Sequence, residues 1–233
     1  MAELVYDKTG RLLFTKEMKK EYTILMPQML PIHFGMFQKM LQLEGYNVVQ
    51  LNNEGQAVVD EGLKYVHNDT CYPALLVIGQ FLDAIKHGGY DPHKVALFIT
   101  QTGGGCRASN YIYLLRKALE KAGLTHIPVI SLNVNGLEQQ PGFHLDASMV
   151  HKFLAAVVYG DTLMYLTNKT RPYEVVHGAA DRLAQKWLAR LSEAFKSGKA
   201  QALGTIKQLT KAIAHEFADL PITNKEKTKV GIV

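Results

Sequence analysis

A continuous apolar run at residues 95–100 (VALFIT) constrains the fold more than any other segment of the chain. Such a run is typical of a strand that is covered on both faces, as the strands of parallel sheets are. Strand and helix patterns alternate from residue 22 to residue 132, which is typical of strand–helix–strand units. The sequence therefore predicts an α/β fold, a parallel sheet flanked by helices. The expected strands are 22–26, 47–51, 95–100 and 128–132, and the expected helices between them are 33–45, 56–66, 73–86 and 106–122.

An all-helical C-terminal segment is expected after the sheet. Its predicted helices are 146–159, 161–168, 174–197 and 201–218. The third has the most regular apolar stripe, made of Val176, Ala180, Leu183, Trp187, Leu191 and Phe195. The expected divisions of the chain are 1–20, an N-terminal β-hairpin; 21–142, the α/β part with both cysteines; 143–226, the helical segment; and 227–233, the start of a next strand in a longer polypeptide.

Composition excludes several classes of protein. Hydrophobic residues make up 47% of the chain and charged residues 20%, which is typical of a globular protein and excludes extensive disorder. The longest apolar run, residues 153–159, is far shorter than the about 20 residues of a membrane-spanning helix. The N-terminus lacks the apolar core of a secretory signal, and two cysteines cannot form a disulfide scaffold. We therefore expect a cytoplasmic protein.

The net charge of +5 comes entirely from the C-terminal quarter of the chain. Residues 1–170 contain 15 Lys and Arg against 15 Asp and Glu, whereas residues 171–233 contain 11 against 6. The excess cations are spread over helical faces without interleaved aromatic residues, which is typical of a solvated surface. The sequence therefore predicts neither a nucleic-acid nor a membrane partner.

Both cysteines stand where a loop enters a helix. Cys71 lies in the turn-rich stretch HNDTCYP, and Cys106 follows the buried strand in the stretch TQTGGGCRASNY. Backbone amides at a helix N-terminus stabilise a thiolate, and Arg107 adds a positive charge beside Cys106. Such a thiolate suits metal ligation, nucleophilic attack or redox exchange. The alternative is that each cysteine is a small buried hydrophobic residue.

Three consecutive glycines precede Cys106, and each of them loses more backbone entropy on folding than any other residue. Close approach of the backbone to an anion or to cluster sulfides would explain the run, and a tight turn is the alternative. Gly103, Gly105 and Ala108 also match the pattern G-x-G-x-x-A, a fingerprint of dinucleotide-binding loops. Such a loop is usually followed by an acidic residue at the end of the next strand, where this chain has Asn133 and Asn135. The predicted cofactor-binding residues are Thr102, Gly103, Gly104, Gly105, Arg107 and Asn110.

The segments around both cysteines carry a family resemblance. HNDTCYPALLVIGQFLDAI, KVALFITQTGGGCRASNYIYLLRKAL and VISLNVNGLEQQPGF resemble the acyl-CoA dehydratase activase-related proteins, long polypeptides of the 2-hydroxyacyl-CoA dehydratase system found mainly in anaerobes. The similarity extends from about Leu12 to the C-terminus and is also specific in MPQMLPIHFG. It implies a cytoplasmic iron–sulfur protein with a Rossmann-like α/β domain like that of the dehydratase subunits. In those subunits loop cysteines hold a four-iron four-sulfur (4Fe-4S) cluster, so Cys71 and Cys106 become candidate ligands.

The chain departs from the family in two respects. A cluster of four irons needs four ligands, or three with substrate or water on one iron, and this chain has two cysteines. The others would come from the remainder of the longer polypeptide, from a second chain, or from His67. The ATP-binding half of the activator is also missing, so residues 1–233 are expected to be part of a larger enzyme or activase. The expected partners are that remainder or a dehydratase or activator component, a second copy in a homodimer, and an acyl-CoA.

Three hypotheses about function follow. The first is an iron–sulfur domain that moves electrons at low potential toward an acyl-CoA-type dehydration. The second is a non-catalytic scaffold or interaction domain, and the third is a nucleotide-binding oxidoreductase domain that uses Gly103–Gly105 as a phosphate cradle. Absorption near 400 nm in anaerobically purified protein favours the first hypothesis, whereas aerobic preparation can strip such a cluster. The first hypothesis also predicts that the sulfurs of Cys71 and Cys106 lie within about 7 Å of each other.

Overall fold

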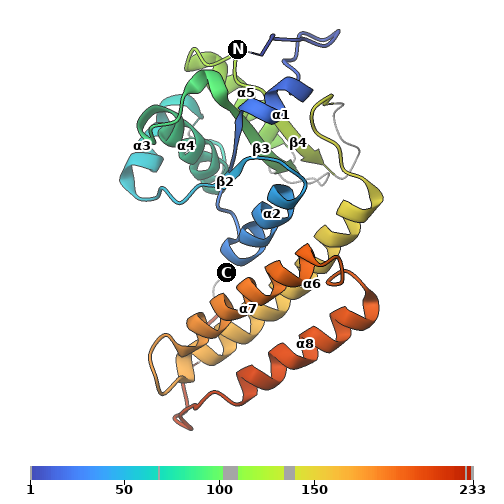
Figure 1. Ribbon diagram of the computed structural model, residues 1–233. Helices are drawn as coiled ribbons and strands as arrows, with labels where there is room; N and C mark the ends of the chain where they lie inside the picture. The colour runs from blue at the N-terminus through green and yellow to red at the C-terminus, as the bar shows by residue number, and fades with distance from the viewer. Residues whose placement is uncertain (1, 68, 102–109, 134–139, 229, 232–233) are drawn as a thin grey trace. The chain divides into compact units, whose positions relative to one another are not determined.

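The computed structural model describes residues 2–67, 69–101, 110–133, 140–228 and 230–231 (Figure 1). The chain divides into two compact units. Unit 1 consists of Met1–Leu30 and Leu41–Leu145, and unit 2 consists of Pro31–Met40 and Asp146–Val233. Unit 1 contains the sheet and most of the helices that connect its strands, whereas unit 2 is helical and includes Pro31–Met40 of the helix between the first two strands.

A four-stranded parallel sheet with the order β2-β1-β3-β4 organises unit 1. Its strands are β1 (Thr23–Met26), β2 (Val48–Gln50), β3 (Val95–Gln101) and β4 (Val129–Asn133). Leu25 of β1 lies opposite Val49 on one side and Leu97 on the other. The predicted α/β fold with a helical C-terminal segment is confirmed. In this strand order the direction of the crossovers reverses between β1 and β3, and in parallel sheets ligands bind at the carboxyl ends of the strands at such a point.

Helices connect the strands and continue into unit 2. Their bounds in the first part of the chain are α1 (Lys16–Glu21), α2 (Pro31–Leu43), α3 (Gln56–Tyr65), α4 (Tyr72–His87), the short 3-10 helix η1 (Pro92–Lys94) and α5 (Tyr111–Lys121). The sequence did not predict α1, because its single buried side chain, Met18, gives no apolar period. A capping box forms this helix instead, in which the Thr15 hydroxyl accepts the Met18 amide and the Met18 sulfur accepts the Thr15 amide.

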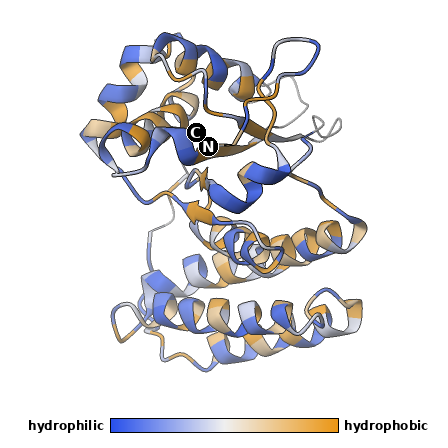
Figure 2. Cartoon of the chain, turned by 45° about the horizontal axis from the view of Figure 1, so that its top comes forward, coloured by the Kyte–Doolittle hydropathy of each residue, from blue (hydrophilic) through white to orange (hydrophobic). Residues whose placement is uncertain are grey.

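Both faces of the sheet are apolar and covered. Leu97 and Ile99 of β3 pack with Phe81 of α4 and Leu115 of α5 in one buried cluster. On the opposite face, the ring of Phe98 packs against that of Phe143 at a tilted angle, with ring centroids 5.8 Å apart. Figure 2 shows hydrophobic residues along the strands and a mixture of hydrophobic and hydrophilic residues on the helices. Coverage on both faces explains why β3 is a continuous apolar run.

Helices α3 and α4 pack closely against each other because each has a glycine at their crossing, Gly62 in α3 and Gly79 in α4. A Cβ atom at Gly79 would lie only 2.1 Å from the carbonyl oxygen of Val58 and 2.9 Å from the amide nitrogen of Gly62. A Cβ at Gly62 would likewise lie 2.5 Å from the carbonyl oxygen of Leu75. The two helix backbones are therefore in direct contact, and no other residue type fits at their crossing.

A buried carboxylate joins the same two helices. Glu61 of α3 is only 4% exposed and accepts hydrogen bonds from Lys64 at 2.6 Å and from Lys86 of α4 at 2.7 Å. The Lys86 ammonium also donates to the Tyr65 hydroxyl at 2.7 Å. Burial works against ionisation of Glu61, but the two lysine hydrogen bonds outweigh it and hold the pKa of the carboxyl below its ordinary value.

Stability of unit 1 is expected to depend on Glu61 in a pH-dependent way. A folded-state pKa below the unfolded-state pKa stabilises the fold above about pH 4.3, and this contribution is lost as the pH falls through the folded-state pKa. Glu61→Gln should therefore lower the free energy of unfolding by about 1–3 kcal/mol at pH 7. The difference from the wild type should shrink toward pH 3. Urea unfolding at both pH values measures this.

The matched control for Glu61 is Glu193→Gln. Glu193 is exposed, and Lys196 lies at the outer limit of an ion pair, 4.0 Å away. Its replacement should leave stability unchanged at either pH. An equal loss for Glu61→Gln at pH 7 and pH 3 would contradict the prediction, because the loss would then come from packing rather than from charge.

Unit 2 is built on three long helices, α6 (Ala147–Thr170), α7 (Ala179–Lys196) and α8 (Leu203–Ala218). The sequence predicted two helices in place of α6, divided at Gly160. That prediction was wrong, because Gly160 lies within one continuous helix and packs against the ring of His33. A Cβ at this position would lie 2.4 Å from that ring, so the glycine serves close packing rather than a break. The buried His33 also contacts Asp161 through Nε2, at 3.0 Å.

The helix predicted at residues 174–197 begins later, at Ala179. A short 3-10 helix, η3 (Arg171–Tyr173), and a loop precede it. Val176, predicted in the apolar stripe, lies in this loop and is 54% exposed. The remaining stripe is confirmed, since Ala180, Trp187, Leu191 and Phe195 are buried and Leu183 is partly buried. Glu174 caps the helix by accepting the amides of Gly178 and Ala180, which a sequence period cannot reveal.

The two ends of the described chain contain little regular structure. Among residues 2–14, Tyr6 and Leu12 form an isolated antiparallel bridge. The described residues of the segment 227–233 lie in no strand. No helix among the described residues is both long enough and apolar enough to cross a membrane.

Candidate functional site

The carboxyl ends of β1 and β3 are the natural place for a ligand in a sheet of this strand order. Thr100, near the end of β3, contacts Met29 of the loop after β1, with 3.9 Å between Oγ1 and the sulfur. The loop after β3 holds most of the predicted site. Thr102, Gly103, Gly104, Gly105, Cys106 and Arg107 lie outside the described residues.

Cys71 occupies the N-cap position of α4 and is a half-buried free thiol. Because α4 and α5 each lead back across the sheet into a following strand, their N-termini lie at the carboxyl ends of the strands. The Cys71 sulfur is 3.9 Å from the hydroxyl of Tyr111, the first residue of α5, which is within reach of a sulfur hydrogen bond. Cys71 therefore lies beside the helix that follows the glycine-rich loop.

Two further predicted residues are described. Asn110 is exposed at the N-cap position of α5, and its side chain makes no capping hydrogen bond. His67 is also exposed, and its Nδ1 accepts the amide of Asp69 at 3.2 Å. The described residues include no group of three His, Cys, Asp or Glu side chains that could hold a metal. Within the described chain, Cys71 thus stands alone as a thiolate donor.

A cavity of about 480 Å³ lies at the carboxyl ends of β1 and β2, and residues of the first turns of α4 form part of its wall. Its lining is rich in carboxamides, and Tyr72, the neighbour of Cys71, forms part of its wall. The polar lining residues are Gln28, Asn53, Glu54, Gln56, Tyr72 and Gln80. Sequence analysis missed this cavity because carboxamides form no motif. The available signal was the position of Gln28 and Asn53 just beyond two predicted strands.

One buried side chain, Gln80 of α4, fixes the walls of this cavity. Its Oε1 accepts the amide of Gln28 at 2.8 Å, and its Nε2 donates to the carbonyl oxygen of Asn53 at 2.9 Å. Asn53 in turn donates to the Gln80 carbonyl and to the Asp83 carboxylate, at 2.9 and 2.7 Å. The buried Oδ1 of Asn53 has no hydrogen-bond partner among the described residues. The loops after β1 and β2 are therefore both anchored on α4.

Comparison of the chain with models of protein families, with curated proteins and with solved structures gives no match in any of the three. The chemistry of the site therefore has to be inferred from its own residues. They provide a thiol at a helix N-terminus, a phenol beside that thiol, and a cavity lined by several carboxamides that α4 helps to form. The thiol can ligate a metal, and the carboxamides can form hydrogen bonds with a bound molecule.

Proposed function

We propose that unit 1 is the iron–sulfur domain of a protein of the 2-hydroxyacyl-CoA dehydratase and activase type. In this proposal it passes electrons at low potential toward the dehydration of an acyl-CoA-type substrate. The observation that supports it is the position of Cys71. This free thiol stands at the N-cap position of α4, and its sulfur lies 3.9 Å from the hydroxyl of Tyr111, the first residue of α5.

The donor chemistry of Cys71 fits an iron–sulfur cluster, because cysteine thiolates are the usual ligands of such clusters. Cys71 and Cys106 would bind iron, and the remaining ligands would come from another part of a longer polypeptide or from a second chain. When bound, the cluster supplies one-electron chemistry. The Tyr111 hydroxyl is placed to hydrogen-bond the Cys71 sulfur, and such a bond tunes the reduction potential of a ligating sulfur.

Anaerobic purification tests this function. The wild-type protein should contain iron and sulfide and absorb broadly near 400 nm, because its thiolates are preserved from oxidation. Cys71→Ser should lose most of both, since serine replaces a thiolate ligand by a hydroxyl. Iron and sulfide analysis of the two proteins measures the loss.

Tyr111→Phe is the matched control for Cys71→Ser. It removes only the hydroxyl beside the sulfur, so iron content should remain while the reduction potential shifts. Circular dichroism verifies that all three proteins are folded. A folded wild-type protein that takes up no iron and sulfide on anaerobic reconstitution would refute cluster binding by this chain with a second copy of itself. A Cys71→Ser protein with the wild-type iron content would refute Cys71 as a ligand and with it the proposal.

A further inference from the structure

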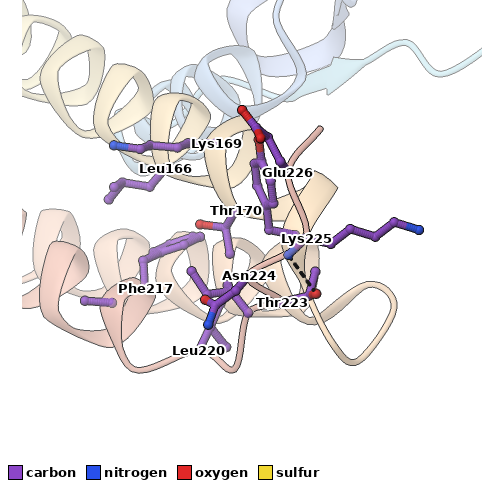
Figure 3. Close-up of a pocket in the computed structure, with 12 residues that line it drawn as sticks. Leu166, Lys169, Thr170, Phe217, Leu220, Thr223, Asn224, Lys225 and Glu226 are labelled. Atoms are coloured by element: carbon purple, nitrogen blue, oxygen red, sulfur yellow. Dashed lines mark hydrogen bonds between the residues drawn. The ribbon is translucent and has the colours of Figure 1, made fainter. Parts of the chain in front are cut away.

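A second cavity, of about 670 Å³, lies within unit 2 (Figure 3). It is formed where the C-terminal ends of α6 and α8 meet the segment that follows α8. Leu166 of α6, Phe217 of α8, and Leu220 and Ile222 of the following segment provide apolar walls. A volume of this size and an apolar lining with a few polar groups are typical of small-molecule sites.

Backbone hydrogen bonds hold the segment that closes this cavity. The amide of Thr223 donates to the carbonyl oxygen of Tyr173 at 2.7 Å, and the amide of Val175 donates to the carbonyl oxygen of Pro221 at 3.0 Å. An antiparallel bridge between Glu174 and Ile222 lies between these two bonds. The wall is therefore preformed, so a ligand does not have to order it on binding.

Charged side chains surround the apolar walls. Lys169, Lys225 and Glu226 all line the cavity and are exposed. Figure 3 shows Lys169 on the α6 side, next to Leu166, and Lys225 on the opposite side. None of the ion pairs among the described residues involves these three side chains. The rim thus has a net positive charge, which attracts an anionic group.

We propose that this cavity binds an aliphatic carboxylate of medium chain length. The chain packs against Leu166, Phe217 and Leu220, because burial of its methylene groups drives association. The carboxylate remains at the rim, where Lys169 or Lys225 meets it. The Thr170 hydroxyl and the Asn224 amide also line the cavity and can donate to the carboxylate. This site is independent of the proposed iron–sulfur function, with which it shares no residue.

Calorimetric titration of the full chain with sodium octanoate tests the apolar part of the proposal. Octanoate should bind to a single site. Ile222→Asp should weaken it by about tenfold or more, because a carboxylate then stands in the apolar wall and repels the ligand. Leu203→Asp is the matched control, since Leu203 is 86% exposed at the start of α8 and outside the cavity. It should leave the affinity unchanged.

The contribution of the charged side chains at the rim is tested with a neutral ligand, 1-octanol, and with substitutions of those side chains. At low salt, the affinity for octanoate should exceed the affinity for 1-octanol by about fivefold or more. The double variant Lys169→Glu/Lys225→Glu should remove this difference in affinity. Glu226→Gln should strengthen octanoate binding. Absence of octanoate binding, equal binding to the Ile222→Asp variant, or equal affinities for octanoate and 1-octanol would each overturn the proposal.

Discussion

Gly79→Ala is expected to destabilise unit 1 by about 3 kcal/mol, the upper end of what overpacking usually costs. The added methyl group would lie 2.1 Å from the Val58 carbonyl oxygen and 2.9 Å from the Gly62 amide nitrogen. Both atoms belong to the α3 backbone, so no side chain can rotate to make room. The helices must separate instead, which weakens the contacts between α3 and α4.

The matched control is Gly204→Ala, which changes another helical glycine. A Cβ at Gly204 in α8 would meet nothing within 4 Å. Its replacement should be neutral or stabilise by up to about 1 kcal/mol, because alanine favours helix. Urea unfolding followed by circular dichroism compares the two variants. A Gly79→Ala protein that unfolds at the wild-type urea concentration would show that the α3–α4 contact relaxes at no cost.

Trp187→Ala is expected to destabilise unit 2 by about 3–5 kcal/mol, as removal of a large buried side chain does. Trp187 is only 4% exposed and belongs to the apolar cluster that α7 shares with α6 and α8. The Arg190 guanidinium lies over its ring, 4.9 Å from the ring to Cζ. The variant therefore loses a cation–π contact and leaves a cavity where the indole ring of the chain's single tryptophan was packed.

Two further variants test whether the loss of stability in Trp187→Ala comes from the burial of its aromatic ring. Trp187→Phe keeps an aromatic ring and removes an indole N–H that has no partner among the described residues, so its cost should stay below about 1.5 kcal/mol. Tyr165→Ala removes a ring that is 62% exposed and should change stability little. If Trp187→Ala were as stable as Tyr165→Ala, the stripe of α7 would not be the core of unit 2.

The fold was predictable where side-chain period and burial agree. Residues 95–100 read as a buried strand because both faces of β3 are covered, and the predicted helix 73–86 matches α4 to within one residue at each end. The errors occur where a local contact overrides the pattern. Gly160 does not break α6, because its missing side chain makes room for the His33 ring. Helix α1 depends on the capping of Thr15 rather than on an apolar stripe.

The candidate site was predictable only in part. Cys71 was placed at a helix N-terminus from its own neighbours in sequence, and the structure has it at the N-cap of α4. The carboxamide-lined cavity depends on hydrogen bonds between Gln80 and two residues, Gln28 and Asn53, that lie 52 and 27 positions away in the sequence. No periodicity signals such pairs. They are set by the packing of α4 on the sheet, which brings loops together that are distant in sequence.

The anchoring of the cavity walls on α4 has a consequence for ligand recognition. Gln80 orients its amide with the oxygen toward the Gln28 N–H and the nitrogen toward the Asn53 carbonyl. Helix α3, which forms another wall, is in backbone contact with α4 through Gly62 and Gly79. The walls of the cavity are thus fixed to one another through α4. A molecule that binds here would therefore pay little entropy to organise those walls.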